Sequence, residues 1–132
     1  MLLRIDTTSS VPVYAQIVDQ ITRAIATGAL RAGDPLSSLR ETAVAHRVNP
    51  LTVAKAYKQL EVYGLIETRH GLGSFVSRDI EAPSREYGRR ALAKAIDDLL
   101  MDARQLGVGI DELRKLIDER IESAERGEPN ER

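Results

Sequence analysis

Residues 38–77 read SLRETAVAHRVNPLTVAKAYKQLEVYGLIETRHGLGSFVS, and this stretch decides the fold. Ser38 and Glu41 have the spacing of a capping box, in which a serine hydroxyl and a glutamate carboxylate satisfy backbone N–H groups at the start of a helix. The spacing predicts a short helix that begins after Ser38. Its apolar residues are Leu39, Ala43 and Val44.

Asn49 and Pro50 mark the start of a second helix. Asparagine is a favoured N-cap, and proline suits the first helical position because an N–H group there would have no intrahelical partner. A helix over residues 50–63 is therefore predicted, with Gly64 as its stop. Only residues 47 and 48 remain to form the turn between the two helices.

Two short β-prone runs, residues 65–69 and 74–77, follow the second helix. Residues 70–73 between them include two glycines, which allow the positive φ that a hairpin tip needs. Helix, tight turn, helix and hairpin in this order predict a winged helix-turn-helix, a fold that reads DNA. The hairpin is the predicted wing.

Ahead of this stretch, apolar residues recur at helical spacing between Ser10 and Gly28. The recurring residues are Val13, Ile17, Ile21, Ala24 and Ile25. This first helix is expected to pack its apolar stripe beneath the two central helices. Leu30 and Leu36, which flank a turn that contains Gly33 and Pro35, are expected to reach the same core.

Residues 79–84 are the expected boundary after the wing, because polar residues and Pro83 interrupt the pattern there. Two helices are predicted beyond it, one from about Arg85 to Leu106 and one that starts near Asp111. The first carries a heptad-like seam, and the second carries an apolar stripe. The seam is Leu92, Ile96, Leu99, Ala103 and Leu106, and the stripe is Leu113, Leu116, Ile117 and Ile121.

Such a short helix pair cannot bury both apolar faces within itself. An identical copy is the simplest partner, because most soluble homo-oligomers are two-fold dimers. The alternative is that the pair folds back on its own N-terminal domain. The expected fold is mainly α with a small β wing: a winged helix-turn-helix DNA-binding domain over residues 11–79 and a two-helix C-terminal dimerisation region over residues 84–126.

Composition argues against several other function classes. The 132 residues suffice for one domain with a helical appendage, and 42% of them are apolar. The chain has no cysteine and two histidines, so we expect neither a metal site nor a cofactor. It has no G-x-S-x-G nucleophile motif and no lysine-containing phosphate loop, so we expect no enzyme activity. No run approaches the roughly 20 apolar residues of a membrane span, so a cytoplasmic protein is expected.

The charge distribution fits a DNA reader better than the net charge of −1 does. Residues 40–78 carry six basic and three acidic side chains, whereas residues 84–132 carry ten basic and twelve acidic ones. The locally basic region is the one expected to approach phosphates.

Five motifs carry a resemblance to a known family. They are PVYAQIV at residues 12–18, GD at 33–34, LSSLRE at 36–41, NPLTVAKAY at 49–57 and GLIETRHGLGSFV at 64–76. Over about residues 11–79 the chain resembles the N-terminal domain of GntR-family bacterial transcription regulators. The NPxTVA string and the short two-helix tail are similar to the YtrA subfamily. One departure is Ser37, where the family commonly has proline.

The resemblance implies a regulator that dimerises through its tail, and that often represses operons for membrane transporters. Carried over position by position, it places DNA contacts at Arg40, Asn49, Leu51, Thr52, His70 and Gly71. Lys55 and Arg69 are added because of their charge and expected exposure. The implied partners are double-stranded DNA and a second copy of the chain.

These residue types suit distinct parts of DNA. Arg40 and Lys55 can neutralise phosphates, which makes affinity fall with salt. In the major groove Asn49 can pair with adenine, Thr52 can donate or accept a hydrogen bond, and Leu51 can pack on a thymine methyl group.

The wing is expected to contact the DNA backbone or the minor groove. His70 and Arg69 can reach a phosphate or a narrow minor groove, and the glycines let the backbone approach closely. Two copies of the chain would read half-sites about 34 Å apart, so the expected operator is palindromic.

Each assignment has a simpler alternative. Asn49 can be only an N-cap, Arg40 an ordinary solvated charge and His70 an ordinary turn residue. The whole domain can also be a protein-interaction module without DNA readout, because the fold alone does not dictate function. An effector stays unknown. No cavity of ligand size, about 300 to 1,000 Å³, is expected within one chain.

Overall fold

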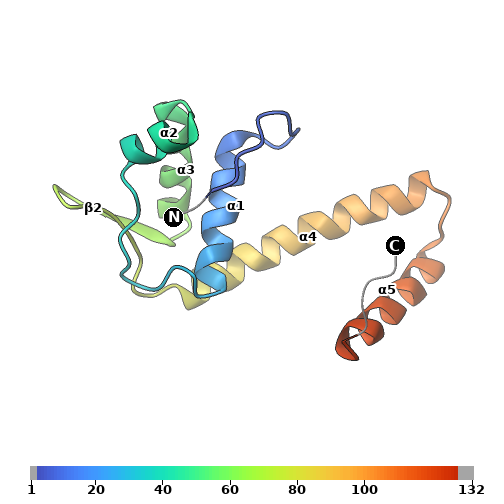
Figure 1. Ribbon diagram of the computed structural model, residues 1–132. Helices are drawn as coiled ribbons and strands as arrows, with labels where there is room; N and C mark the ends of the chain where they lie inside the picture. Colours follow the sequence, from blue (N-terminus) through green and yellow to red (C-terminus); the bar gives the residue numbers. More distant parts are fainter. Residues whose placement is uncertain (1–2, 128–132) are drawn as a thin grey trace. The chain divides into compact units, whose positions relative to one another are not determined.

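The computed structural model describes residues 3–127, and its elements follow the predicted order (Figure 1). They are α1 Val13–Ala26, α2 Leu39–His46, α3 Pro50–Val62, β1 Ile66–Arg69, β2 Gly73–Val76, α4 Glu81–Gln105 and α5 Ile110–Glu125. The chain divides into two compact units, residues 1–89 and residues 90–132. The prediction of a mainly α fold with a small β wing is confirmed.

Both predicted helix caps are present. The Ser38 hydroxyl accepts a hydrogen bond from the Glu41 N–H at 3.0 Å, and the Ser38 N–H donates to the Glu41 carboxylate at 3.2 Å. Asn49 caps α3, and Pro50 is its first residue. Arg47 forms the turn between α2 and α3 in a left-handed conformation, with φ of 53°. Among residues 3–127 it is the only non-glycine residue with positive φ.

The wing is an antiparallel hairpin in which Ile66 pairs with Val76 and Arg69 pairs with Gly73. Its tip turns at Gly71, where φ is +77°, a conformation that residues with a side chain rarely adopt. The chain before α2 also joins β2, through an isolated bridge from Pro35 to Phe75. At the base of the wing, β2 is therefore paired on both sides, with β1 and with the segment before α2.

The core of the first unit lies among α1, α3 and the base of the wing. Its largest fully buried side chains are Ile17, Ile21, Val53, Leu60, Leu65 and Val76. The predicted stripe of α1 is confirmed, since Ile17, Ile21 and Ile25 are buried and Val13 packs at the edge. Leu36 is buried and Leu30 packs against the core, also as predicted.

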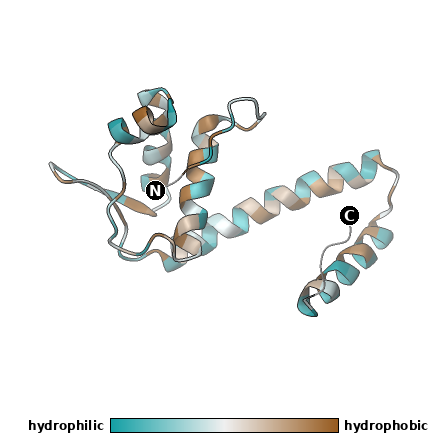
Figure 2. Cartoon of the chain, viewed as in Figure 1, coloured by the Kyte–Doolittle hydropathy of each residue, from teal (hydrophilic) through white to brown (hydrophobic). Residues whose placement is uncertain are grey.

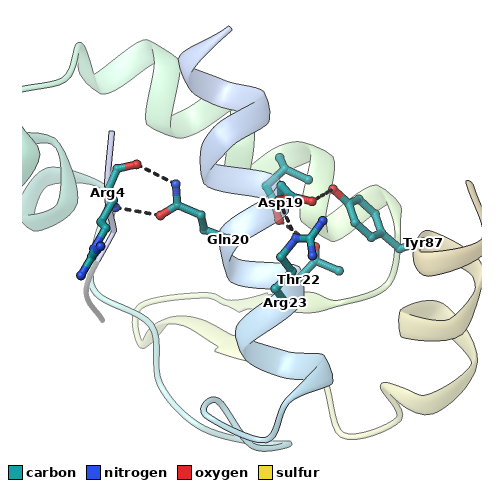
Figure 3. Close-up of polar contacts among 7 residues, drawn as sticks. Arg4, Asp19, Gln20, Thr22, Arg23 and Tyr87 are labelled. Atoms are coloured by element: carbon teal, nitrogen blue, oxygen red, sulfur yellow. Dashed lines mark hydrogen bonds and ion pairs between the residues drawn. The ribbon is translucent and has the colours of Figure 1, made fainter. Parts of the chain in front are cut away.

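An N-terminal arm precedes α1, and two glutamine side chains hold it. The Gln20 amide bonds to both the N–H and the C=O of Arg4, at 2.8 and 2.7 Å (Figure 3). The Gln16 amide bonds to the N–H and the C=O of Asp6 in the same way, at 2.9 and 2.8 Å. Leu3, in this arm, is buried in the core.

Helix α4 begins at Glu81, four residues before the predicted start. Pro83 lies in its first turn, where the missing N–H breaks no intrahelical bond. The expected helix start near Arg85 is therefore wrong, whereas residues 77–80 do lie outside the strands and helices, between the wing and α4. The division between the compact units falls within α4. The functional division into residues 11–79 and 84–126 stays a prediction.

The second unit contains the end of α4, a short turn and α5. The Val108 N–H donates to the Ala103 C=O at 2.8 Å, which closes the turn. Within the described part of this unit, Ala103 and Leu113 are the buried hydrophobic residues. Hydrophobic residues recur among hydrophilic ones along both helices (Figure 2).

Candidate nucleic-acid interface

Helix α3 has one buried face and one outward face. Val53, Ala56, Tyr57 and Leu60 are buried beneath it, as predicted. On the outward face Leu51 is 77% exposed, Lys55 and Lys58 are exposed, and Thr52 is partly exposed. An exposed leucine in the first turn of a helix, with lysines one and two turns further on, suits a helix that enters a DNA groove.

Asn49 performs the capping role that the sequence predicts. Its Oδ1 accepts a hydrogen bond from the Leu51 N–H at 2.8 Å. The cap uses the carbonyl of the side-chain amide, which leaves the Nδ2 group as a donor for another partner. The same side chain can therefore start the helix and meet a base.

Arg40 lies in the first turn of α2 and is exposed. It borders an open hollow of about 470 Å³ along α2, which also touches Val44 and His46. Val44 is 74% exposed, unlike its expected place among the apolar residues of this helix. The reason is that α2 has only two turns, and the face with Ala43 and Thr42 already fills the contact with α3.

A buried hydroxyl network holds the start of α2 against α3. The Tyr57 hydroxyl donates to the Ser37 C=O at 2.7 Å, and the Thr42 hydroxyl lies 3.0 Å from the same oxygen. Because the tyrosine proton goes to Ser37, Thr42 is the donor to Tyr57. Burial raises the pKa of the Tyr57 hydroxyl, so it stays protonated. The network fixes the segment in which Ser37 replaces the family's proline.

Lys55 has a partner that the sequence analysis missed. Its Nζ lies 3.9 Å from the centre of the Tyr14 ring, which α1 supplies. A cation over an aromatic face is attracted to the ring, which restricts the conformations of the lysine side chain. Lys55 is therefore held at the edge of the outward face of α3.

Arg69 on the wing also has partners. Its guanidinium donates to Glu67 Oε1 at 2.9 Å and lies 4.4 Å from the centre of the Phe75 ring. The spacing of Glu67 and Arg69 on one strand could have revealed the ion pair, because residues i and i+2 share a face of a strand. Phe75 lies on the same face, since it pairs with Glu67.

The wing tip and the end of α3 complete the site. His70 and Gly71 are exposed at the tip, beside Leu72, which is 73% exposed and was not among the predicted contacts. Thr68 of β1 donates a hydrogen bond to Glu61 of α3, which ties the wing to that helix.

The first unit therefore contains all eight predicted contact residues, each of them at least partly exposed. They come from α2, from α3 with its cap, and from the wing. Their contact with DNA stays a prediction.

The second unit contains a hollow that was not predicted. It has a volume of about 530 Å³ and lies between the end of α4 and the start of α5, beside Leu100, Met101, Val108 and Ile110. The expectation that one chain has no hollow of this size is therefore wrong.

Residues 3–127 contain no cluster of three or more histidine, cysteine or acidic side chains placed to hold a metal ion. None of the helices in that range is long and apolar enough to cross a membrane.

The order of elements, the capped α3 and the hairpin define a DNA-binding protein of the winged helix-turn-helix class. The family model described as bacterial regulatory proteins, gntR family, matches residues 13–76. The transcriptional repressor YtrA of Bacillus subtilis is 35% identical over 129 residues, which are 98% of this chain and 99% of that protein. The chain therefore belongs to the GntR family of transcriptional regulators, in its YtrA-like subfamily.

Solved structures show the same relation. A transcriptional regulator from Oenococcus oeni is 34% identical with a TM-score of 0.68, over 91% of this chain and 99% of that one. YtrA from Sulfolobus acidocaldarius, a GntR-family transcription factor, is 32% identical with a TM-score of 0.57, over 92% of this chain and 97% of that one. The likeness to both proteins extends through the tail as well as the winged domain.

Proposed function

We propose that this protein is a cytoplasmic repressor that binds a palindromic operator as a homodimer. The observation that carries the proposal is the outward face of α3, where Leu51 is 77% exposed beside Thr52 and Lys55. Residues 11–79 would read DNA, and residues 84–126 would hold the two copies together. The similarity to the YtrA repressor of Bacillus subtilis, which extends over 99% of that protein, supports repression rather than activation.

Each group of predicted contacts has its own role. Arg40, Lys55 and Arg69 neutralise phosphates and supply affinity that falls with salt. Leu51, Thr52 and the Nδ2 group of Asn49 meet base edges and supply sequence choice. His70 and Gly71 place the wing tip against the backbone or the minor groove.

The homodimer is proposed because the second unit leaves its seam exposed. Leu92 is 67% exposed, Ile96 55% and Leu106 78%, whereas Ala103 of the same seam is buried. On α5, Leu116 and Ile121 are about half exposed. Contiguous apolar surface of this kind marks an interaction site. A second copy is the occupant that the seam favours, because a two-fold interface pairs each seam with itself.

The regulated genes are proposed from the subfamily. YtrA-like regulators often repress operons for membrane transporters, and an operon of that kind near this gene is the proposed target. Footprinting the purified protein on the DNA that flanks its own gene would locate the operator. A protected palindrome with half-sites about one helical turn apart is expected.

A gel shift at graded salt tests the DNA-binding role. The wild-type protein should retain its own promoter fragment, and its affinity should fall steeply as salt rises. Arg40→Ala should lower the affinity about tenfold and make the salt dependence shallower by about one counterion. Arg31→Ala is the matched control, because it removes an exposed positive charge from the turn after α1, outside the proposed contacts.

The alternative, a protein-interaction module, predicts a different result. Such a module would not retain the promoter fragment at any salt concentration. Equal effects of Arg40→Ala and Arg31→Ala would show that only total charge matters, which contradicts the proposed site.

A further inference from the structure

The first two turns of α4 contact two elements of the first unit, α1 and the end of α3. The Tyr87 hydroxyl donates to Asp19 Oδ1 of α1 at 3.1 Å (Figure 3), and its ring meets the Tyr63 ring, at the end of α3, edge-on at 5.7 Å between centres. The other oxygen of Asp19 accepts from Arg23 at 2.8 Å. Arg23, on the same helix as Asp19, therefore restrains the carboxylate in the position where it accepts the Tyr87 hydrogen bond.

The Tyr87 side chain is partly buried, and its hydroxyl stays protonated. Burial of the Tyr87 ring, together with the Asp19 carboxylate, raises the pKa of the Tyr87 hydroxyl well above its usual value. Tyr87 and Ile80 both pack against the core of the first unit. The first two turns of α4 thus belong structurally to the first unit, residues 1–89, which we call the reading unit.

The first turn of α4 also lies close to the end of α3. A Cβ built on Gly64, two residues beyond the end of α3, would lie 3.5 Å from the Pro83 Cγ. The chain just beyond the proposed recognition helix is therefore in contact with the helix that leads to the seam. The contacts of Pro83 and Tyr87 therefore resist small rotations of the first two turns of α4.

Gly88 follows Tyr87 directly and lies within α4. Glycine in a helix interior has more backbone freedom than any other residue. A Cβ at Gly88 would meet nothing within 4 Å, so packing does not require a glycine. The division between the two compact units falls one residue later, after Arg89.

We propose that Tyr87 and Gly88 form a joint that sets which half-site separations the dimer accepts. Tyr87 is a positioning residue that clamps the first two turns of α4 to the reading unit. Gly88 is the flexible position between this clamp and the seam that begins at Leu92. The inference rests on the dimeric DNA-binding function proposed above.

The physical reason is the geometry of the double helix. Adding one base pair between half-sites moves the second half-site along the axis and rotates it around the axis, so a stiff dimer tolerates only a narrow range of separations. Losing the Tyr87 bond should widen that range. Replacing Gly88 with alanine should narrow it.

The test is a competition gel shift with the full-length protein. The competitors are the footprinted operator and versions with one or two base pairs added or removed between the half-sites. Tyr87→Phe keeps the ring and loses the hydroxyl, so the preference for native spacing should fall by about threefold, as expected for one hydrogen bond of ordinary net strength. Gly88→Ala should raise that preference by about twofold, since alanine stiffens the helix.

Two controls separate positioning from folding. Affinity for a DNA with a single half-site should not change in either variant, because neither residue is a predicted DNA contact. Glu81→Gln removes an exposed partner of Arg85 on the same helix and should leave the spacing preference unchanged.

The outcomes distinguish the joint from the proposed function. If the variants bind the operator as dimers and their spacing preferences match the wild type, the joint is refuted while the proposed function stands. If the wild-type protein retains no promoter fragment, both proposals fail. A change in opposite directions for Tyr87→Phe and Gly88→Ala supports the joint, since a general loss of stability would not sharpen either preference.

Discussion

The two units of this chain differ in how they bury their apolar side chains. In the first, residues such as Leu60 and Val53 are fully buried, whereas seam residues of the second, such as Leu92 and Leu106, are mostly exposed. Burial of apolar surface is the main stabilising term in folding. The comparison indicates that the first unit is stabilised by its own core, whereas the tail leaves apolar surface exposed, as the proposed homodimer requires.

The largest expected effect comes from the core of the first unit. Leu60→Ala should lower the free energy of unfolding by about 3 kcal/mol, because it leaves a cavity under α3. The effect should not depend on protein concentration. Leu99→Ala is the matched change at a seam residue that is 39% exposed. Its loss of unfolding free energy should be small at low protein concentration and larger at high concentration, where the dimer forms. Urea unfolding at several protein concentrations measures both.

The next effect concerns the seam. Ile96→Glu puts a charge where Ile96 is 55% exposed in the single chain, so the fold should tolerate it. A dimer should not tolerate it, and sedimentation equilibrium should show single chains, with operator affinity lower by about 100-fold. Gln105→Glu adds the same charge to α4 outside the seam and should remain dimeric. An Ile96→Glu protein that stays dimeric would refute the proposed interface.

A smaller effect is expected from the hydroxyl network of the first unit. Tyr57→Phe leaves the Ser37 carbonyl and the Thr42 hydroxyl without their shared partner, which should lower the free energy of unfolding by about 1–2 kcal/mol. Tyr14→Phe is the control and should change it by less than about 0.5 kcal/mol, because it keeps the partly buried ring that packs against the core. Thermal unfolding compares the two, and equal losses would argue against the network.

The smallest effect concerns the wing. Glu67 holds Arg69 in an ion pair between partly exposed side chains, and such pairs are weak. Glu67→Gln should release Arg69 toward phosphate and raise DNA affinity by about threefold in a gel shift. Glu61→Gln removes an equal charge next to the wing but not from Arg69. A gain that persists when Arg69 is replaced by alanine would contradict this role.

Local signals in the sequence were sufficient to predict the reading unit. The Ser38 and Glu41 capping box, the Asn49 cap and the glycines of the wing all act within a few residues of their own positions, so their meaning can be read without a structure. The outward face of α3 followed from helical spacing alone. The candidate site depended on the same signals together with the family motifs.

Contacts between distant residues could not be predicted in this way. Tyr87 and Asp19 are 68 positions apart, and nothing near either residue marks the other as its partner. The arm with Leu3 is held by side chains of α1 that look like ordinary surface glutamines in the sequence. The early start of α4 was missed because Pro83 is a helix breaker in most positions and harmless in a first turn.

The cap of α3 affects how this protein could be retargeted to a new binding sequence. Asn49 holds the helix start through the Leu51 N–H, so changing it alters folding and base choice together. The Leu51 side chain is 77% exposed and has no such structural duty. A library meant to redirect base preference would therefore keep the asparagine and vary the two positions that follow Pro50.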